Sequence, residues 1–179
     1  MAHSKGNVEA IGTSGSVWAG FRSVNIKDLF FETLKSATSS VQISSYAMGR
    51  KNEEMKEFFS IIEGLLESPH MKINIIVNDD GRGSTSRYAM GRLDRLAKKY
   101  PEQFFPQLFE SKPDAGLGKI LHAKLTVVDG TTALVGSANI SKSALESNYE
   151  IMLKVTGHAA ADIAAMLVKL SNKLREKKV

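Results

Sequence analysis

The sequence contains no cysteine, which excludes disulfide bonds and thiolate metal sites and leaves the redox compartment open. It also lacks any apolar run of the roughly 18 to 20 residues that a membrane-spanning helix requires. Residues 1–20 are rich in Gly, Ser and Ala but have no continuous apolar core of the kind found in signal peptides. These absences predict a cytoplasmic protein without a stable membrane insertion.

The composition is typical of one soluble globular domain with a basic surface. Hydrophobic residues make up 42% and charged residues 24% of the 179 positions. The formal net charge of +5 and the pI of about 9.4 fit an anionic partner such as nucleic acid or a phospholipid surface. Charge alone does not decide between these partners, since many basic proteins bind neither.

Hydrophobic periodicity predicts helices and strands in alternation. We expect a flexible lead-in over residues 1–20 and a single catalytic domain over 21–179. Helices are predicted over 25–37, 52–68, 86–99 and 159–175, and strands over 41–46, 71–77, 104–109, 121–128, 132–135 and 148–155. Met166 is among the apolar residues of the last helix that we expect to face inward. This order predicts an α/β fold, a mixed β-sheet sandwiched by helices.

One short region concentrates side chains that suit phosphate chemistry. Its members, in order, are His122, Lys124, Asp129, Gly136, Ser137 and Asn139. On a strand His122 and Lys124 point to the same face, because strand side chains alternate. The turn at Asp129 and Gly130 then returns the chain alongside. The pattern therefore gathers an imidazole, an ammonium, a hydroxyl and an amide around one small space at the edge of a sheet.

These groups suit the cleavage of a phosphodiester. Lys124 supplies charge, and Ser137 and Asn139 supply donors to the negative oxygens of an in-line displacement. His122 can attack phosphorus and become a phosphohistidine, while the leaving alkoxide takes a proton from a second group. No cofactor and no metal site are predicted, because Lys124 would repel a cation and no carboxylate cluster has ligand spacing.

The spacing HxK, four residues, D, six residues, GSxN resembles the signature of the phospholipase D superfamily, and every signature position is matched. The resemblance implies a phospholipase D-like fold, with catalytic roles for His122, Lys124, Asn139 and Ser137 and structural roles for Asp129 and Gly136. A structural role for Asp129 also fits its place before a turn glycine. The resemblance further implies that Glu150 orients a histidine; the alternative is a solvated strand residue.

Superfamily enzymes usually carry two copies of the motif, whereas this sequence has one. By resemblance to the single-motif members, we expect a homodimer in which two chains pool their motifs. One His122 would be the nucleophile and its mate the general acid. A lone chain would lack that proton donor.

Several basic residues are candidates for substrate binding. Lys119 precedes His122 by three residues, and the others lie in the loop and helix after residue 79: Arg82, Arg87, Arg92 and Arg95. If they border the catalytic groove they would neutralise a nucleic-acid backbone. The alternative is a solvated helix face.

Three classes of function follow from this sequence. The first is a nuclease acting on nucleic acid, with DNA favoured over RNA, alone or within a larger restriction or defence assembly. The second is a phospholipase D or phosphatidyltransferase, which is disfavoured because the predicted loops are polar. The third is a non-enzymatic module with a relic site, which the intact His122, Lys124 and Asn139 argue against.

Overall fold

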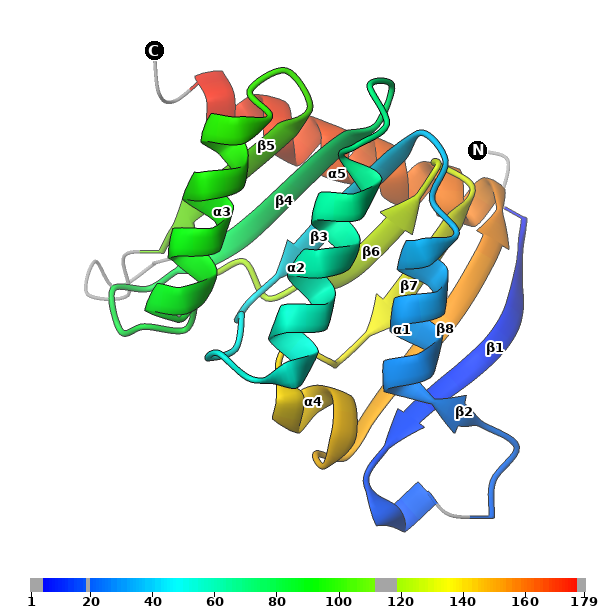
Figure 1. Cartoon of the computed structure of the whole chain (residues 1–179). Helices are drawn as coiled ribbons and strands as arrows, with labels where there is room; N and C mark the ends of the chain where they lie inside the picture. Colours follow the sequence, from blue (N-terminus) through cyan, green and yellow to red (C-terminus); the bar gives the residue numbers. More distant parts are fainter. Residues whose placement is uncertain (1–4, 19, 112–118, 177–179) are drawn as a thin grey trace.

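The computed structural model describes residues 5–18, 20–111 and 119–176 of the chain. They form one eight-stranded mixed sheet with helices on both faces (Figure 1), which confirms the predicted fold class. The strand order is β2-β1-β8-β7-β6-β3-β4-β5. β3, β4 and β5 run parallel to one another, whereas β6, β7, β8 and β1 are antiparallel neighbours.

The elements lie close to the positions predicted from periodicity. The strands are β1 Gly6–Ser14, β2 Val24–Asn25, β3 Ser40–Ser45, β4 Lys72–Asp79, β5 Phe104–Glu110, β6 Lys124–Val128, β7 Thr132–Gly136 and β8 Glu150–Gly157. The helices are the 3-10 helix η1 Ser16–Trp18, α1 Ile26–Lys35, α2 Glu53–Leu65, α3 Arg87–Lys99, α4 Lys142–Glu146 and α5 His158–Glu176. None of the described helices is long and apolar enough to cross a membrane.

The larger core lies between one face of the sheet and the layer formed by α1, α2 and α3 (Figure 1). Phe30 of α1 and Phe58 of α2 stack with ring centroids 6.2 Å apart, and both are buried. Burying a phenylalanine side chain stabilises the fold by roughly 1.5–3 kcal/mol. The Asn52 side chain accepts a hydrogen bond from the Met55 N–H, so α2 begins at the predicted cap. This layer fixes β3 and β4, which lead to the site described below.

Among the described elements, α5 is the one helix on the opposite face of the sheet, which it contacts through a narrow stripe of mostly small residues. Ala160, Ala164, Leu167 and Ser171 are buried and follow helical spacing. Met166 lies outside this stripe and is 66% exposed, so the expectation that it faces inward is wrong. The smaller side chains let the helix lie close to the sheet.

The prediction of a flexible lead-in is wrong over Gly6–Ser14, since these residues form β1 and pair with β8. Residues 1–4 and 19 of that segment lie outside the described residues. The glycines that suggest a loop are positions of close packing. A Cβ on Gly12 would lie 2.8 Å from Leu29 Cδ2, and one on Gly6 would lie 2.5 Å from Ala159 Cβ. Glycine therefore allows α1 and α5 to approach the strand.

Candidate active site

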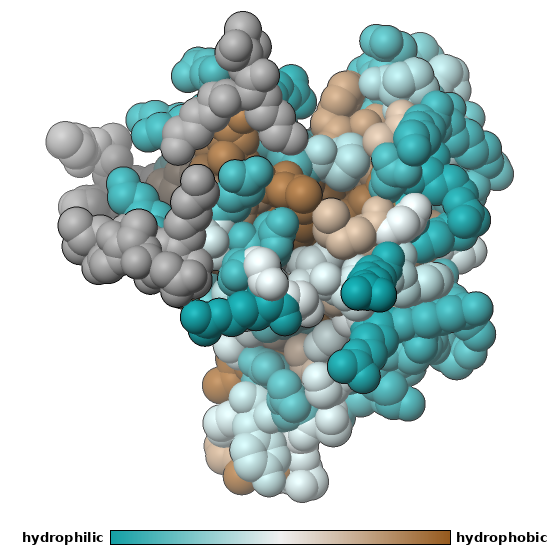
Figure 2. Space-filling view, turned by 90° about the vertical axis from the view of Figure 1, so that its left-hand side faces the viewer, coloured by the Kyte–Doolittle hydropathy of each residue, from teal (hydrophilic) through white to brown (hydrophobic). Residues whose placement is uncertain are grey.

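His122, Lys124, Ser137 and Asn139 gather at the end of the sheet where β3 and β7 finish and β6 and β8 begin. Lys124 opens β6 opposite Gly136, and Gly136 in turn lies opposite Met152 of β8. His122 precedes β6 instead of lying within it as predicted, but it remains two residues from Lys124. Figure 2 views the molecule from the side toward which β3, β4 and β5 run, and shows hydrophobic residues in a depression with hydrophilic residues to its right and below.

Lys124 is a buried cation held beside His122. Its side chain donates from Nζ to the His122 carbonyl oxygen at 2.9 Å, and Nζ lies 5.5 Å from the centre of the Tyr46 ring. Burial lowers the pKa of Lys124, and the negative charge of Glu150 opposes that shift. The lysine is therefore a fixed donor of charge with little exposure to water, which strengthens its interaction with an anion.

His122 itself is exposed and packs against an aromatic ring that the sequence analysis did not identify. The His122 and Tyr46 ring centroids are 5.2 Å apart, and the Tyr46 hydroxyl donates to Asp80 Oδ2 at 3.0 Å. This hydrogen bond is the main reason that the pKa of Tyr46 is raised. Tyr46 directly follows β3, and its place at the end of a predicted strand was the available sequence signal.

The Asn139 side chain has a fixed orientation. Its Oδ1 accepts from the Ala47 backbone N–H at 3.1 Å and from Ser45 Oγ at 3.4 Å. Its Nδ2 makes no hydrogen bond to the described part of the chain, so two N–H groups remain for a ligand. The nearby Ser137 hydroxyl instead accepts from the Ile151 N–H at 3.2 Å, which ties it to β8. Asn139 is thus the more available donor of the two.

Glu150 does not contact His122 within the described chain. Its Oε1 accepts from Asn148 Nδ2 at 3.2 Å, and its charge acts on Lys124. The predicted role of Glu150 in orienting a histidine therefore stays a prediction.

Asp129 lies at the other end of β6, away from His122. Its carboxylate accepts hydrogen bonds from the backbone N–H groups of Thr38, Ser39 and Ser40 and from the hydroxyls of Thr38 and Ser39. Burial alone would raise the pKa of Asp129, but the backbone donors of Ser40, Thr38 and Ser39 outweigh it and hold the pKa well below its usual range. These contacts support the predicted structural role.

The predicted basic residues lie in different surroundings. Arg92 donates to Glu63 Oε2 at 3.1 Å and lies 5.4 Å from the centre of the Phe59 ring, so it joins α3 to α2, and its role in substrate binding stays a prediction. Arg95 is exposed on α3 and lines no hollow of the described chain that we identify. Arg82 and Arg87 line a hollow beside Asn139, and Lys119 is exposed on the segment that leads to His122.

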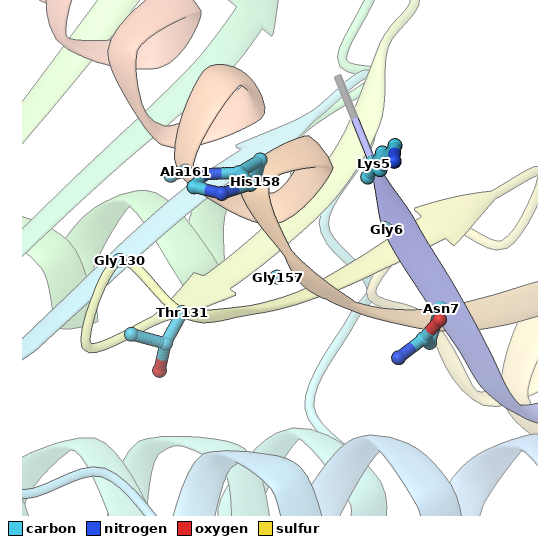
Figure 3. Close-up of a pocket in the computed structure, with 8 residues that line it drawn as sticks. All are labelled: Lys5, Gly6, Asn7, Gly130, Thr131, Gly157, His158 and Ala161. Atoms are coloured by element: carbon cyan, nitrogen blue, oxygen red, sulfur yellow. The ribbon is translucent and has the colours of Figure 1, made fainter. Parts of the chain in front are cut away.

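Among the described residues, no three His, Cys, Asp or Glu side chains gather as a metal-ligand set. A separate hollow of about 350 Å³ lies at the Asp129 end of the sheet, with His158 and Lys5 on either side (Figure 3). Its lining residues are Lys5, Gly6, Asn7, Gly130, Thr131, Gly157, His158 and Ala161. None of the motif residues lines it, because His122, Lys124 and Asn139 lie toward the opposite end of β6 and the Asp129 carboxylate is bonded to residues 38–40.

The site combines a buried lysine, an oriented amide and an exposed histidine, which are groups that suit the binding of a phosphate ester. Residues 30–170 match the family described as "Cardiolipin synthase, PLD-like domain". The chain therefore belongs to the phospholipase D-like domain family, a phosphodiesterase superfamily. This confirms the resemblance drawn from the motif.

The comparisons with individual proteins agree with this assignment. The fold is similar to NucT from Helicobacter pylori, with a TM-score of 0.67 and 21% identity over 97% of both chains. It is also similar to the phospholipase D family member Nuc from Salmonella typhimurium, with a TM-score of 0.61 and 19% identity over 96% of this chain and 95% of that one. The DISARM protein DrmC from Bacillus paralicheniformis is 28% identical over 139 residues, 78% of this chain. The chain spans about half of that relative, 53% of its length.

Proposed function

We propose that this chain is a metal-independent nuclease that hydrolyses nucleic-acid phosphodiesters through His122, with DNA preferred over RNA. The observation that carries the proposal is an anion site already formed beside an exposed imidazole. Lys124 Nζ is held 2.9 Å from the His122 carbonyl oxygen, and Asn139 Oδ1 is held by Ala47 N–H so that Nδ2 is left for a ligand. The net charge of +5 favours a polyanionic substrate.

The reaction has two displacements. In the first, an imidazole nitrogen of His122 bonds to phosphorus, the bond from phosphorus to the leaving oxygen breaks, and an imidazolium protonates that oxygen. In the second, water attacks the phosphohistidine, gives its proton to the same second imidazole, and releases a phosphomonoester. Lys124 and Asn139 stabilise the equatorial oxygens in both steps.

The second imidazole is proposed to come from a second copy of the chain. In the described residues, His158 lies at the far end of the sheet (Figure 3) and His70 precedes β4, whose carboxyl end faces the site. Exposed apolar residues flank the motif: Ile151, which is 41% exposed, contacts Ser137, and Tyr149, which is 66% exposed, precedes Glu150. Such a surface fits a two-fold contact that places two His122 residues at one phosphate.

A cleavage assay in excess EDTA tests the activity. Wild-type protein is incubated with single- and double-stranded DNA and RNA, beside His122→Ala and the exposed control His70→Ala. We expect cleavage by the wild type and by His70→Ala, and a loss of at least about 10³-fold in His122→Ala. Full activity in His122→Ala would remove the proposed nucleophile.

A mixing experiment tests the shared site. Wild type and His122→Ala are unfolded together, refolded in varied ratios, and assayed at constant total protein. If each site needs both histidines, activity follows the square of the wild-type fraction, because only wild-type pairs are active. A linear dependence would show that one chain suffices.

The comparisons suggest one alternative substrate to test and one biological setting. The family description names a cardiolipin synthase, so phosphatidylglycerol vesicles serve as the substrate for the alternative activity, a phospholipase D or phosphatidyltransferase. Cleavage of lipid without cleavage of nucleic acid would replace the nuclease proposal. The similarity to a DISARM protein supports a place in a larger defence assembly.

A further inference from the structure

A hollow of about 560 Å³ lies directly beside Asn139, on the α3 side of the site. Its lining includes three arginines and an aromatic ring: Arg50, Arg82, Arg87 and Tyr88. Ala47, whose N–H holds Asn139 Oδ1 at 3.1 Å, also lines it. The hollow therefore neighbours Asn139 through Ala47.

Three distant segments of the chain are fastened together to form this hollow. The Gly49 N–H donates to the Ile140 carbonyl at 2.8 Å, and the Ser86 N–H donates to the Met48 carbonyl at 2.9 Å. Ser86 also donates from Oγ to the Gly49 carbonyl. The loop that carries Arg82 is fixed in turn by Asp80, which accepts from the Arg82 N–H at 2.9 Å and from the Tyr46 hydroxyl at 3.0 Å. Backbone contacts thus place the arginines next to the catalytic residues.

The hollow carries positive charge that the protein leaves available. Arg50 and Arg87 are exposed and form no ion pair with any described residue. The Asp80 carboxylate, two residues before Arg82, accepts from the backbone N–H groups of Arg82 and Ser84 and from the Tyr46 hydroxyl. Arg92, on the same helix as Arg87, differs from it because it forms an ion pair with Glu63. An anionic ligand is the partner that this arrangement fits.

We infer that the hollow binds one strand of nucleic acid next to the phosphate that is cleaved, with Arg50, Arg82 and Arg87 on the backbone and Tyr88 beneath a base. Its volume lies in the range of small-molecule sites, about 300–1,000 Å³, which suits a short stretch of one strand instead of the face of a duplex. Arginines along a groove with an aromatic platform are the usual means of binding single strands. The inference rests on the proposed nuclease function and specifies its substrate as single-stranded.

The test is equilibrium binding of a fluorescein-labelled oligothymidylate to protein carrying His122→Ala, so that no cleavage occurs. In that background, Arg50→Ala with Arg87→Ala is compared with Arg95→Ala with Lys169→Ala, which removes the same charge from exposed sites outside the hollow. The salt slope is the slope of log K against log salt concentration, and each lost phosphate contact makes it shallower by about 0.7. The hollow variant loses two contacts, so its slope should be shallower by about 1.4. Taking equal affinity at 1 M salt, this corresponds to roughly 25-fold weaker binding at 0.1 M salt. The control should bind within about twofold of its parent. Equal thermal melting of both variants confirms that they are folded.

The possible outcomes distinguish failure of the strand-binding hollow from failure of the proposed nuclease function. Equal affinity and salt slope in the two variants would overturn the hollow as the binding site, even if the wild type cleaves nucleic acid. Tighter binding of a matched duplex than of the single strand would overturn the single-strand assignment. Failure of the wild type to cleave any nucleic acid would reject the nuclease, while selective weakening in the hollow variant would still establish the site.

Discussion

The strongest stability prediction concerns the Asp129 carboxylate, which holds the loop that enters β3. Its Oδ2 accepts from Thr38 N–H and Oγ1, and its Oδ1 accepts from Ser39 N–H, Ser39 Oγ and Ser40 N–H, all at 2.8–2.9 Å. Asp129→Asn keeps the shape and tolerates the backbone φ of 51° at this position. The new NH₂ group, however, would face N–H and O–H donors of residues 38–40 and could not accept from them. The hydrogen bonds to the remaining oxygen would have a neutral acceptor in place of a charged one. A bond to a charged acceptor contributes about 1 kcal/mol more than a neutral one, so we expect a loss of roughly 2–4 kcal/mol in unfolding free energy.

Thermal and urea denaturation measure this loss. For a chain of this size each kcal/mol shifts Tm by about 2–4 °C, so Asp129→Asn should melt roughly 4–16 °C below the wild type at pH 7. The pKa of Asp129 is lowered on folding, so its contribution is complete above the unfolded pKa near 3.9 and is lost as the pH falls below that value. The difference between variant and wild type should therefore shrink below about pH 4. Equal melting at pH 7, or a gap that does not shrink in acid, would refute this account.

The same variant distinguishes stability from catalysis. Asp129 lies at the opposite end of β6 from Lys124, and all of its hydrogen bonds go to residues 38–40. We expect kcat below the melting transition to stay within about threefold of the wild type. A loss of 100-fold in kcat with unchanged Tm would instead place Asp129 in the chemistry.

Three further variants, one of them with a matched control variant, test separate features. Gly136→Ala should destabilise the fold by roughly 1–3 kcal/mol or more, because the new Cβ would lie 2.2 Å from the Ile151 carbonyl oxygen. Gly64→Ala is its control: it meets nothing within 4 Å in α2 and should stabilise by roughly 0.5–1 kcal/mol in the same urea titration. Asn139→Asp keeps the acceptor for Ala47 N–H but presents a negative oxygen to the substrate, so kcat/KM should fall by roughly 10²–10³-fold with little change in Tm. Arg92→Ala should cost roughly 1–2 kcal/mol of stability and leave oligonucleotide affinity unchanged, since its charge is used by Glu63; a weakened affinity would restore it to the substrate site.

The features that could be predicted from sequence are those that depend on residues close together in the chain. The stripes of α1 and α2, the Asn52 cap and the turn after β6 each depend on residues a few positions apart. The motif could be found for the same reason, because β6 and β7 are consecutive antiparallel strands. Spacing along one hairpin therefore translates directly into neighbours in space.

The features that were missed depend on partners far away in sequence. β1 pairs with β8, about 140 residues later, and its glycines report contacts with α1 and α5 that no local pattern contains. Arg92 has the spacing of a basic stripe, but its partner Glu63 lies on another helix. Tyr46 gains its place beside His122 only because β3 and β6 are neighbours. In each case the deciding contact is tertiary.

The division of the motif between two ends of one short strand gives the spacing between Lys124 and Asp129 a structural meaning. Lys124 opens β6 beneath His122, and Asp129 directly follows the last residue of the strand, Val128. Asp129 fixes residues 38–40 at the start of β3, whose far end carries Ser45, Tyr46 and Ala47 to Asn139 and His122. An insertion in β6 would reverse the face of Lys124 relative to Asp129, since side chains alternate along a strand. The aspartate can thus act on the site through the register of β3 and β6 without approaching the phosphate.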